Sequence, residues 1–163
     1  MNNFAAASTS VFLMATKLKV LIVEDDFMIA DMSEDMLVHE GYDVCGIAAT
    51  VEAAVSLGLL HKPDLALIDF RLADGGLGTE VAIRLRAKSR IGVLYATGNS
   101  KHIAFQDAEG EACLAKPYQA QDLMRGLKIV AEFVATGNSA LSFPRGFHLL
   151  HHPYSQPVAF SNG

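Results

Sequence analysis

The sequence has few cysteines, no excess of basic residues and no long apolar run, and each shortage excludes a class of protein. Its two cysteines, Cys45 and Cys113, lie far apart inside apolar segments, which argues against a disulfide framework and favours a reducing compartment. The net charge of −5 leaves no basic face for nucleic acid. No apolar segment is long enough to cross a membrane, so we expect a cytoplasmic protein.

The residues that are present suffice for one domain. Hydrophobic residues make up 51% of the 163 positions, enough for a single core of ordinary size. Residues 1–16 lack the positive region of a signal peptide, and we expect them to form a disordered leader before a domain at 17–136. Residues 137–163 hold three of the five prolines and are expected to be a tail that docks on the domain or on a partner. This tail is too short for a helix-turn-helix module.

Short apolar runs alternate with segments of helical periodicity along the domain. We predict strands at 19–23, 43–48, 65–69, 91–97 and 112–116. We predict helices at 27–40, where Met28, Ile29, Met32, Met36 and Leu37 recur at helical spacing, and at 51–62, 78–88, about 100–108 and 119–136. Strands that are apolar throughout are typical of parallel sheets buried on both faces. The pattern therefore predicts an α/β fold with a doubly wound five-stranded parallel sheet.

Chemically active side chains stand where the predicted strands end. They are Glu24, Asp25 and Asp26 after the first strand, Asp69 at the end of the third, Thr97 at the end of the fourth and Lys116 at the end of the fifth. Because parallel strands present the same end at one edge of a sheet, we expect these side chains to lie together there. Asp26 has a second interpretation, as the N-cap of the helix that follows it.

Such a group of residues is suited to phosphoryl transfer. Crowded carboxylates repel one another, so a proton or a cation must bind among them. An oxygen-only ligand set favours Mg²⁺ over zinc, because no histidine or cysteine joins it. A carboxylate beside Mg²⁺ can attack a phosphoryl donor and become an aspartyl phosphate. The metal and Lys116 would neutralise the phosphoryl oxygens, and Thr97 would offer them a hydroxyl.

Four segments, in this order, resemble the receiver domain of two-component response regulators. They are VLIVEDD, LALIDFRLADGG, VLYATGNS and CLAKPY, and the resemblance extends over about residues 17–136. The third segment is similar to a subgroup of stand-alone receivers with a Phe-Ala-Thr-Gly stretch, in which Tyr95 here replaces the phenylalanine. The resemblance implies a flavodoxin-like fold with strand order 2-1-3-4-5.

The resemblance also implies a role for each site residue. Asp69 matches the phosphoacceptor, which is also a metal ligand, and Asp25 matches a direct Mg²⁺ ligand. The remaining matches are Glu24, which reaches the metal through water, Arg71, whose backbone carbonyl binds it, Thr97, the switch hydroxyl, and Lys116, the invariant lysine, with a cis bond to Pro117. The phosphoryl group would come from a phosphohistidine on a histidine kinase or phosphotransfer protein. A downstream protein, or a second copy, would bind the face from the fourth to the fifth helix.

The chain departs from the family pattern at three places. Cys113 stands three residues before the lysine, where many receivers carry an aromatic residue that acts as a rotameric switch. The loop after Asp69 lacks the common Met-Pro, and its glycines form neither a dinucleotide fingerprint nor a phosphate-binding loop, so a flexible loop is expected. Arg71 and Asn99 occupy variable positions that tune the phosphoryl lifetime in the family.

The sequence thus favours a phosphoacceptor switch in a two-component system or phosphorelay, acting through protein partners or as a phosphate sink. It would be no enzyme beyond its own phosphotransfer and autodephosphorylation. One alternative is a pseudo-receiver that binds partners without being phosphorylated. The other is a Mg²⁺-dependent aspartyl-phosphate hydrolase, whose family carries a second aspartate two residues after the nucleophile, where Arg71 stands here.

Overall fold

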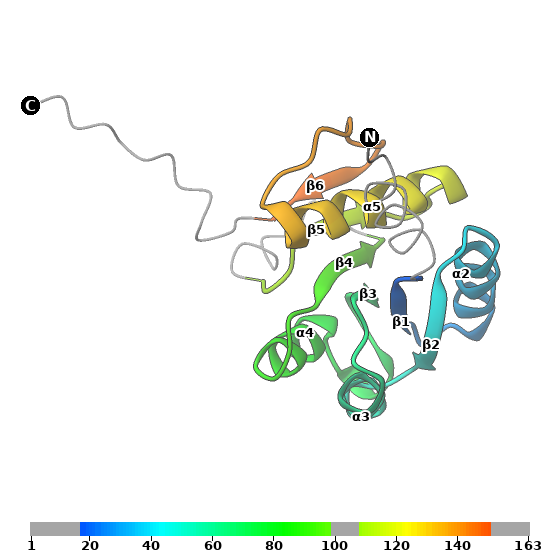
Figure 1. Ribbon diagram of the computed structural model, residues 1–163. Helices are drawn as coiled ribbons and strands as arrows, with labels where there is room; N and C mark the ends of the chain where they lie inside the picture. Colours follow the sequence, from blue (N-terminus) through cyan, green and yellow to red (C-terminus); the bar gives the residue numbers. More distant parts are fainter. Residues whose placement is uncertain (1–16, 99–107, 151–163) are drawn as a thin grey trace, which may run out of the picture.

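The computed structural model describes residues 17–98 and 108–150, which form one sheet between two pairs of helices (Figure 1). The strands are β1 (Lys19–Val23), β2 (Asp43–Ala48), β3 (Leu65–Asp69), β4 (Gly92–Thr97), β5 (Ala112–Ala115) and β6 (Phe147–Leu149). The helices are α2 (Phe27–His39), α3 (Val51–His61), α4 (Gly78–Arg86) and α5 (Ala120–Thr136), with a short turn η1 (Ala73–Gly75). The predicted leader, and the predicted helix near 100–108 apart from Ala108, lie outside the described residues.

The strand order is β2-β1-β3-β4-β5-β6. Strands β1 to β5 pair in parallel, which confirms the predicted doubly wound arrangement and its order 2-1-3-4-5. Strand β6 was not predicted and pairs antiparallel to β5, with Cys113 opposite His148. No helix in the described part of the chain has the length and apolar character needed to span a membrane.

Alternate residues of each central strand enter two separate cores. In β1, Leu21 and Val23 join the core under α3 and α4, whereas Val20 and Ile22 join the core under α2 and α5. This two-sided burial is the reason why the strands read as unbroken apolar runs. It also requires helices on both faces, which right-handed crossovers between parallel strands supply.

Side-chain caps begin two of the helices, and the first of these caps was expected from the sequence. The Asp26 carboxylate accepts hydrogen bonds from the backbone N–H groups of Met28 (3.0 Å) and Ile29 (3.3 Å), which confirms its N-cap interpretation. The Thr50 hydroxyl oxygen accepts one from Ala53 N (3.2 Å). Both caps lie at the carboxyl-end edge of the sheet, so they also set where the residues of that edge are placed.

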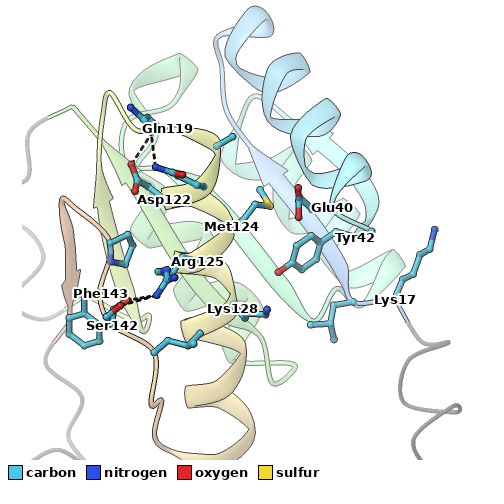
Figure 2. A pocket seen from close by; sticks show the side chains of 16 residues that line it. Lys17, Glu40, Tyr42, Gln119, Asp122, Met124, Arg125, Lys128, Ser142 and Phe143 are labelled. Carbon is cyan, nitrogen blue, oxygen red and sulfur yellow. Dashed lines mark hydrogen bonds between the residues drawn. The ribbon is translucent and has the colours of Figure 1, made fainter.

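The segment after α5 turns back along that helix and covers the outer edge of β5. Ala115 N donates to Gly146 O (2.9 Å), and Leu150 N donates to Glu111 O (2.9 Å). The buried Phe147 ring lies against α5 at Gly126, where an added Cβ would meet it at 3.5 Å. Beside this segment runs an open groove of about 1090 Å³, where the Arg125 guanidinium donates to the Ser142 hydroxyl oxygen at 2.8 Å (Figure 2).

We expect Phe147→Ala to lower the free energy of unfolding by about 3–5 kcal/mol, because it empties a buried site between α5 and the sheet. The matched control is Phe143→Ala, which removes a half-exposed ring that packs on Phe147 with 5.0 Å between centroids. Its expected cost is about 1 kcal/mol. Urea denaturation measures both. Equal, small losses would show that β6 contributes little to the stability of the domain.

Candidate functional site

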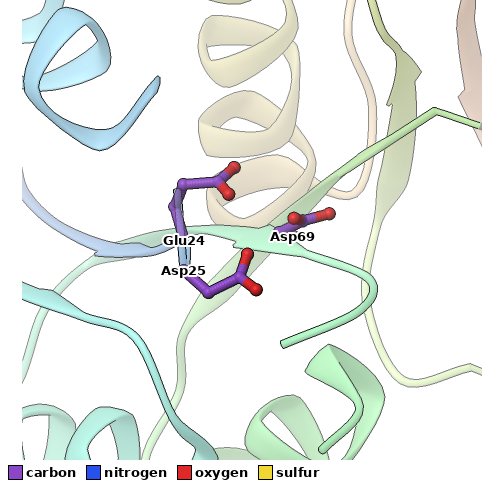
Figure 3. A group of neighbouring side chains, drawn as sticks. All are labelled: Glu24, Asp25 and Asp69. Carbon is purple, nitrogen blue, oxygen red and sulfur yellow. The ribbon is translucent and has the colours of Figure 1, made fainter. Parts of the chain in front are cut away.

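Three carboxylates meet at the carboxyl ends of β1 and β3 (Figure 3). Glu24 and Asp25 directly follow β1, and Asp69 is the last residue of β3. One carboxylate oxygen from each lies within 4.8 Å of those of the other two. Parallel pairing of β1 with β3 brings these ends together, although Asp25 and Asp69 are 44 positions apart in the sequence.

The Lys116 ammonium bridges two of these carboxylates from the end of β5. Its Nζ donates to Glu24 Oε2 at 2.9 Å and lies 3.5 Å from Asp69 Oδ2. The Lys116 backbone N–H donates to the carbonyl oxygen of Thr97 at 2.8 Å, and its peptide bond to Pro117 is cis. The lysine is therefore fixed through its backbone on β4 and through its ammonium on β1 and β3.

Burial differs among the three acids, and it raises the pKa of Glu24. Glu24 is only 7% exposed, whereas Asp25 is exposed and the Asp69 side chain is 16% exposed. Burial raises the pKa of Glu24, partly offset by its hydrogen bonds from Lys116 and from the Asp26 backbone. Burial alone would lower the pKa of Lys116, but the bond to Glu24 and the charge of Asp69 outweigh it and the pKa is raised. The lysine therefore keeps its positive charge.

The donor set suits a divalent, oxygen-preferring cation. Three carboxylates face one ammonium, which leaves two negative charges uncompensated when all are ionised. Every potential ligand atom in the cluster is a carboxylate oxygen, the type that Mg²⁺ prefers. Asp25 is exposed on the open side of the cluster, where a metal ion could keep its water ligands. These residues therefore fit Mg²⁺.

The other predicted site residues occupy different positions around this cluster. Thr97 is buried at the end of β4 and lies in register with Ala115, the residue before Lys116. Arg71 is exposed in the loop after β3 and forms an antiparallel bridge with Leu77; a metal contact by its carbonyl stays a prediction. The Asp26 carboxylate points to its helix, where it caps two N–H groups rather than joining the cluster.

Helix α2 presents an apolar surface next to the site. The sequence pattern alone did not reveal this surface. Phe27, Met28 and Met32 are 80%, 73% and 61% exposed, although Met28 and Met32 share the apolar helical spacing. The buried residues of α2 are instead Ala30, Ser33 and Leu37. Because apolar residues occur on several sides of this helix, periodicity could not tell which side faces the core. The only indication in the sequence that these side chains lie near the site was that the helix begins directly after Asp25 and Asp26.

An aromatic residue on β4 packs beside Cys113. Tyr95 is fully buried, stands in register with Cys113 and belongs to the same core under α3 and α4. Its hydroxyl donates to the carbonyl oxygen of Glu109, and burial raises the pKa of this phenol, which keeps it a donor. Glu111 nearby pairs with Arg86 of α4 and accepts from Val93 N at 2.6 Å. The ring also lies close to Gly110, where an added Cβ would meet Tyr95 Cε2 at 2.8 Å.

Comparison with curated proteins identifies relatives among bacterial regulators. The chain is 32% identical over 114 residues to the transcriptional regulatory protein PdtaR of Mycobacterium tuberculosis, which covers 68% of this chain and 55% of that protein. It is 32% identical over 108 residues to the phyllosphere-induced regulator PhyR of Methylorubrum extorquens, covering 65% and 40% respectively. The chain thus spans about half the length, or less, of these curated relatives.

Solved structures with a similar fold also include receiver domains. The signal receiver domain of a modulated diguanylate cyclase from Desulfovibrio desulfuricans G20 is 30% identical, with a TM-score of 0.66 over 76% of this chain and 100% of that one. A CheY-like receiver domain from Methanospirillum hungatei is 27% identical, with a TM-score of 0.63 over 76% and 100%. The family model for the response regulator receiver domain matches residues 20–128. The chain therefore belongs to the response regulator receiver domain family.

Proposed function

We propose that this chain is a phosphoacceptor switch in which Asp69 takes a phosphoryl group from a phosphohistidine of a histidine kinase or phosphotransfer protein. One observation carries the proposal: Asp69, Glu24 and Asp25 place carboxylate oxygens within 4.8 Å of one another, and the Lys116 ammonium lies 3.5 Å from Asp69. This arrangement combines a nucleophile, ligands for Mg²⁺ and a fixed positive charge in one site.

The proposed chemistry assigns one task to each side chain. An Asp69 oxygen attacks the phosphorus atom, forming an O–P bond while the P–N bond of the donor histidine breaks. Lys116 neutralises charge on the transferred phosphoryl oxygens, and Thr97 donates its hydroxyl to one of them. Asp25 and Asp69 would hold Mg²⁺ directly and Glu24 would do so through water, and the bound metal would supply further charge neutralisation. Water later hydrolyses the acyl phosphate and returns the domain to its resting state.

The exposed side of α2 supports the proposal that the phosphoryl donor is a protein. Phe27, Met28 and Met32 form an apolar surface beside the phosphoacceptor, and Asp26 at the start of α2 follows the metal-binding pair directly. A partner that presents a phosphohistidine to Asp69 would cover this surface. Output would then occur through a further protein partner, through a second copy, or by removal of phosphate from a competing pathway. We place these events in the cytoplasm.

The two alternative functions have less support. A phosphate-ester hydrolase of the related chemistry needs a proton donor two residues after the nucleophile. Arg71 stands there with an exposed guanidinium, which does not release its proton in a protein. A pseudo-receiver would lack part of the reactive set, whereas here Glu24, Asp25, Asp69 and Lys116 lie together.

The first test is labelling of Asp69. With Mg²⁺ and a small phosphoryl donor such as acetyl phosphate, we expect the intact mass to rise by one phosphoryl group, and Asp69→Asn to abolish the gain. Asp74→Asn is the matched control, because it changes an exposed aspartate in the same loop and asparagine tolerates its positive φ of 66°. No gain for the unmodified chain with any donor would support the pseudo-receiver, and steady turnover of unrelated phosphate esters would support the hydrolase.

The second test concerns the α2 surface. We expect the double substitution Met28→Gln with Met32→Gln to slow transfer from a cognate kinase by about tenfold or more, because loss of anchoring contacts costs more than 1 kcal/mol. Labelling by acetyl phosphate should stay unchanged, since neither side chain belongs to the carboxylate cluster. Leu60→Gln is the control, because Leu60 is also exposed but lies on α3. Equal transfer rates for the unmodified chain, the double variant and Leu60→Gln would show that the kinase does not dock on α2.

A further inference from the structure

The loop that follows Asp69 is closed by backbone contacts. Leu72 N donates to Gly76 O at 2.9 Å, and Gly78 N donates to Phe70 O at 2.8 Å. Between them Arg71 bridges Leu77 as in a short antiparallel pair. The turn at its tip uses two residues in the left-handed region, Asp74 (φ 66°) and Gly75 (φ 73°). The flexible loop expected from its glycines is therefore a hairpin-like element with a defined path.

Gly78 brings the start of α4 into direct contact with the phosphoacceptor backbone. A Cβ on Gly78 would lie 2.2 Å from the carbonyl oxygen of Asp69 and 2.6 Å from Ile68 Cγ2, whereas ordinary contacts are 3.4–4 Å. Gly78 is the first residue of α4, and its φ lies outside the left-handed region. Its backbone conformation therefore suits any residue, and the close approach is what requires glycine at this position.

Neither side of this contact can move away easily. The Asp69 backbone belongs to the sheet, where it lies in register with Ala96, and Phe70 N donates to Ala96 O at 3.3 Å. Helix α4 is held by Val81 and Leu85, which are buried in the core that it shares with α3. A methyl group inserted between the two must therefore displace the end of β3, the start of α4, or both.

We propose that Gly78 is a positioning residue for phosphoryl transfer: by letting α4 rest on the Asp69 carbonyl, it fixes the Asp69 carboxylate against Glu24 and Asp25. This proposal rests on the function proposed above. Gly76 makes a second contact of the same kind, because its Cβ would lie 2.7 Å from Val51 Cγ2 on α3. The loop therefore packs closely at two points: Gly78 lies against the backbone of Asp69, and Gly76 lies against Val51 on α3.

The direct test is Gly78→Ala. We expect its affinity for Mg²⁺ to fall by about tenfold or more, as when a group that orients a metal ligand is lost, because Mg²⁺ demands nearly ideal ligand geometry. Isothermal titration calorimetry with Mg²⁺ alone measures this affinity. The rate of phosphoryl gain from acetyl phosphate, followed by intact mass, should fall with it. In the metal-free protein, the amides of Asp69 and Phe70 should exchange hydrogen faster than in the unmodified chain.

Two glycine substitutions serve as matched controls. Gly75→Ala lies in the same loop and strains the backbone at φ 73°, but its Cβ meets nothing within 4 Å. Gly58→Ala overlaps the Leu85 side chain at 2.5 Å within the core, and the three atoms nearest to its Cβ all belong to Leu85 rather than to a site residue. Both should lose stability and keep the Mg²⁺ affinity of the unmodified chain. The proposal is overturned if Gly78→Ala binds Mg²⁺ normally, or if Gly58→Ala loses as much affinity as Gly78→Ala does.

A rescue experiment keeps the test decisive if Gly78→Ala does not fold. Gly76→Ala should weaken Mg²⁺ binding less, since the Val51 side chain can adjust, and adding Val51→Ala removes the methyl that the new Cβ meets. If the Mg²⁺ affinity recovers in the double variant Gly76→Ala with Val51→Ala, the contacts of the loop with its neighbours position the site as proposed. If it does not recover, the proposal is overturned. If the unmodified chain gains no phosphoryl group, the proposed function fails; the hydrogen exchange of the metal-free variants still decides whether Gly78 positions Asp69.

Discussion

The structure of the site depends on one electrostatic constraint, the repulsion among three carboxylates that parallel strands bring to the same edge. Lys116 relieves part of it by bridging Glu24 and Asp69, with Nζ–oxygen distances of 2.9 and 3.5 Å. The remaining charge is of the size that a divalent cation neutralises. Because the lysine spans two acids at once, the position of β5 relative to β1 and β3 governs the geometry of the whole cluster. Elements that hold β5 in place therefore matter for the chemistry.

Several features distant from the carboxylates hold that edge in place. Strand β6 pairs with the outer edge of β5, and Gly146 accepts a hydrogen bond from Ala115, which precedes Lys116. On the other side of β5, Thr97 accepts from the Lys116 backbone, and Tyr95 packs beside Cys113. Strand β5 is thus an interior strand in this chain, bonded along both sides. An interior strand frays less than an edge strand, which suits a strand followed directly by the lysine that we propose for phosphoryl transfer.

The same additional strand changes which surfaces are open to partners. The segment from residue 139 to Leu149 covers part of α5 and the edge of β5, so a partner that used this face would contact that segment as well. The exposed apolar side of α2, by contrast, lies directly beside Asp25 and carries no covering element within the described residues. The arrangement separates a surface near Asp69 from a surface that is already partly occupied by the chain itself.

The amino-acid pattern was enough to predict the order and type of the central elements and the residues that gather at the site. Unbroken apolar runs indicated strands buried on both faces, and the acids and the lysine after them indicated a shared edge, because parallel strands allow no other placement. Features that depend on packing between distant segments could not be predicted in this way. Periodicity could not orient α2, where Met28 and Met32 face outward, because apolar residues lie on several of its sides. A three-residue strand such as β6 carries too little pattern to be predicted, since its pairing depends on the free edge of β5 and on the space that Gly126 leaves for Phe147. At Gly78 an added Cβ would lie 2.2 Å from the carbonyl oxygen of Asp69, nine residues earlier, and the identity of neither residue reveals this close packing.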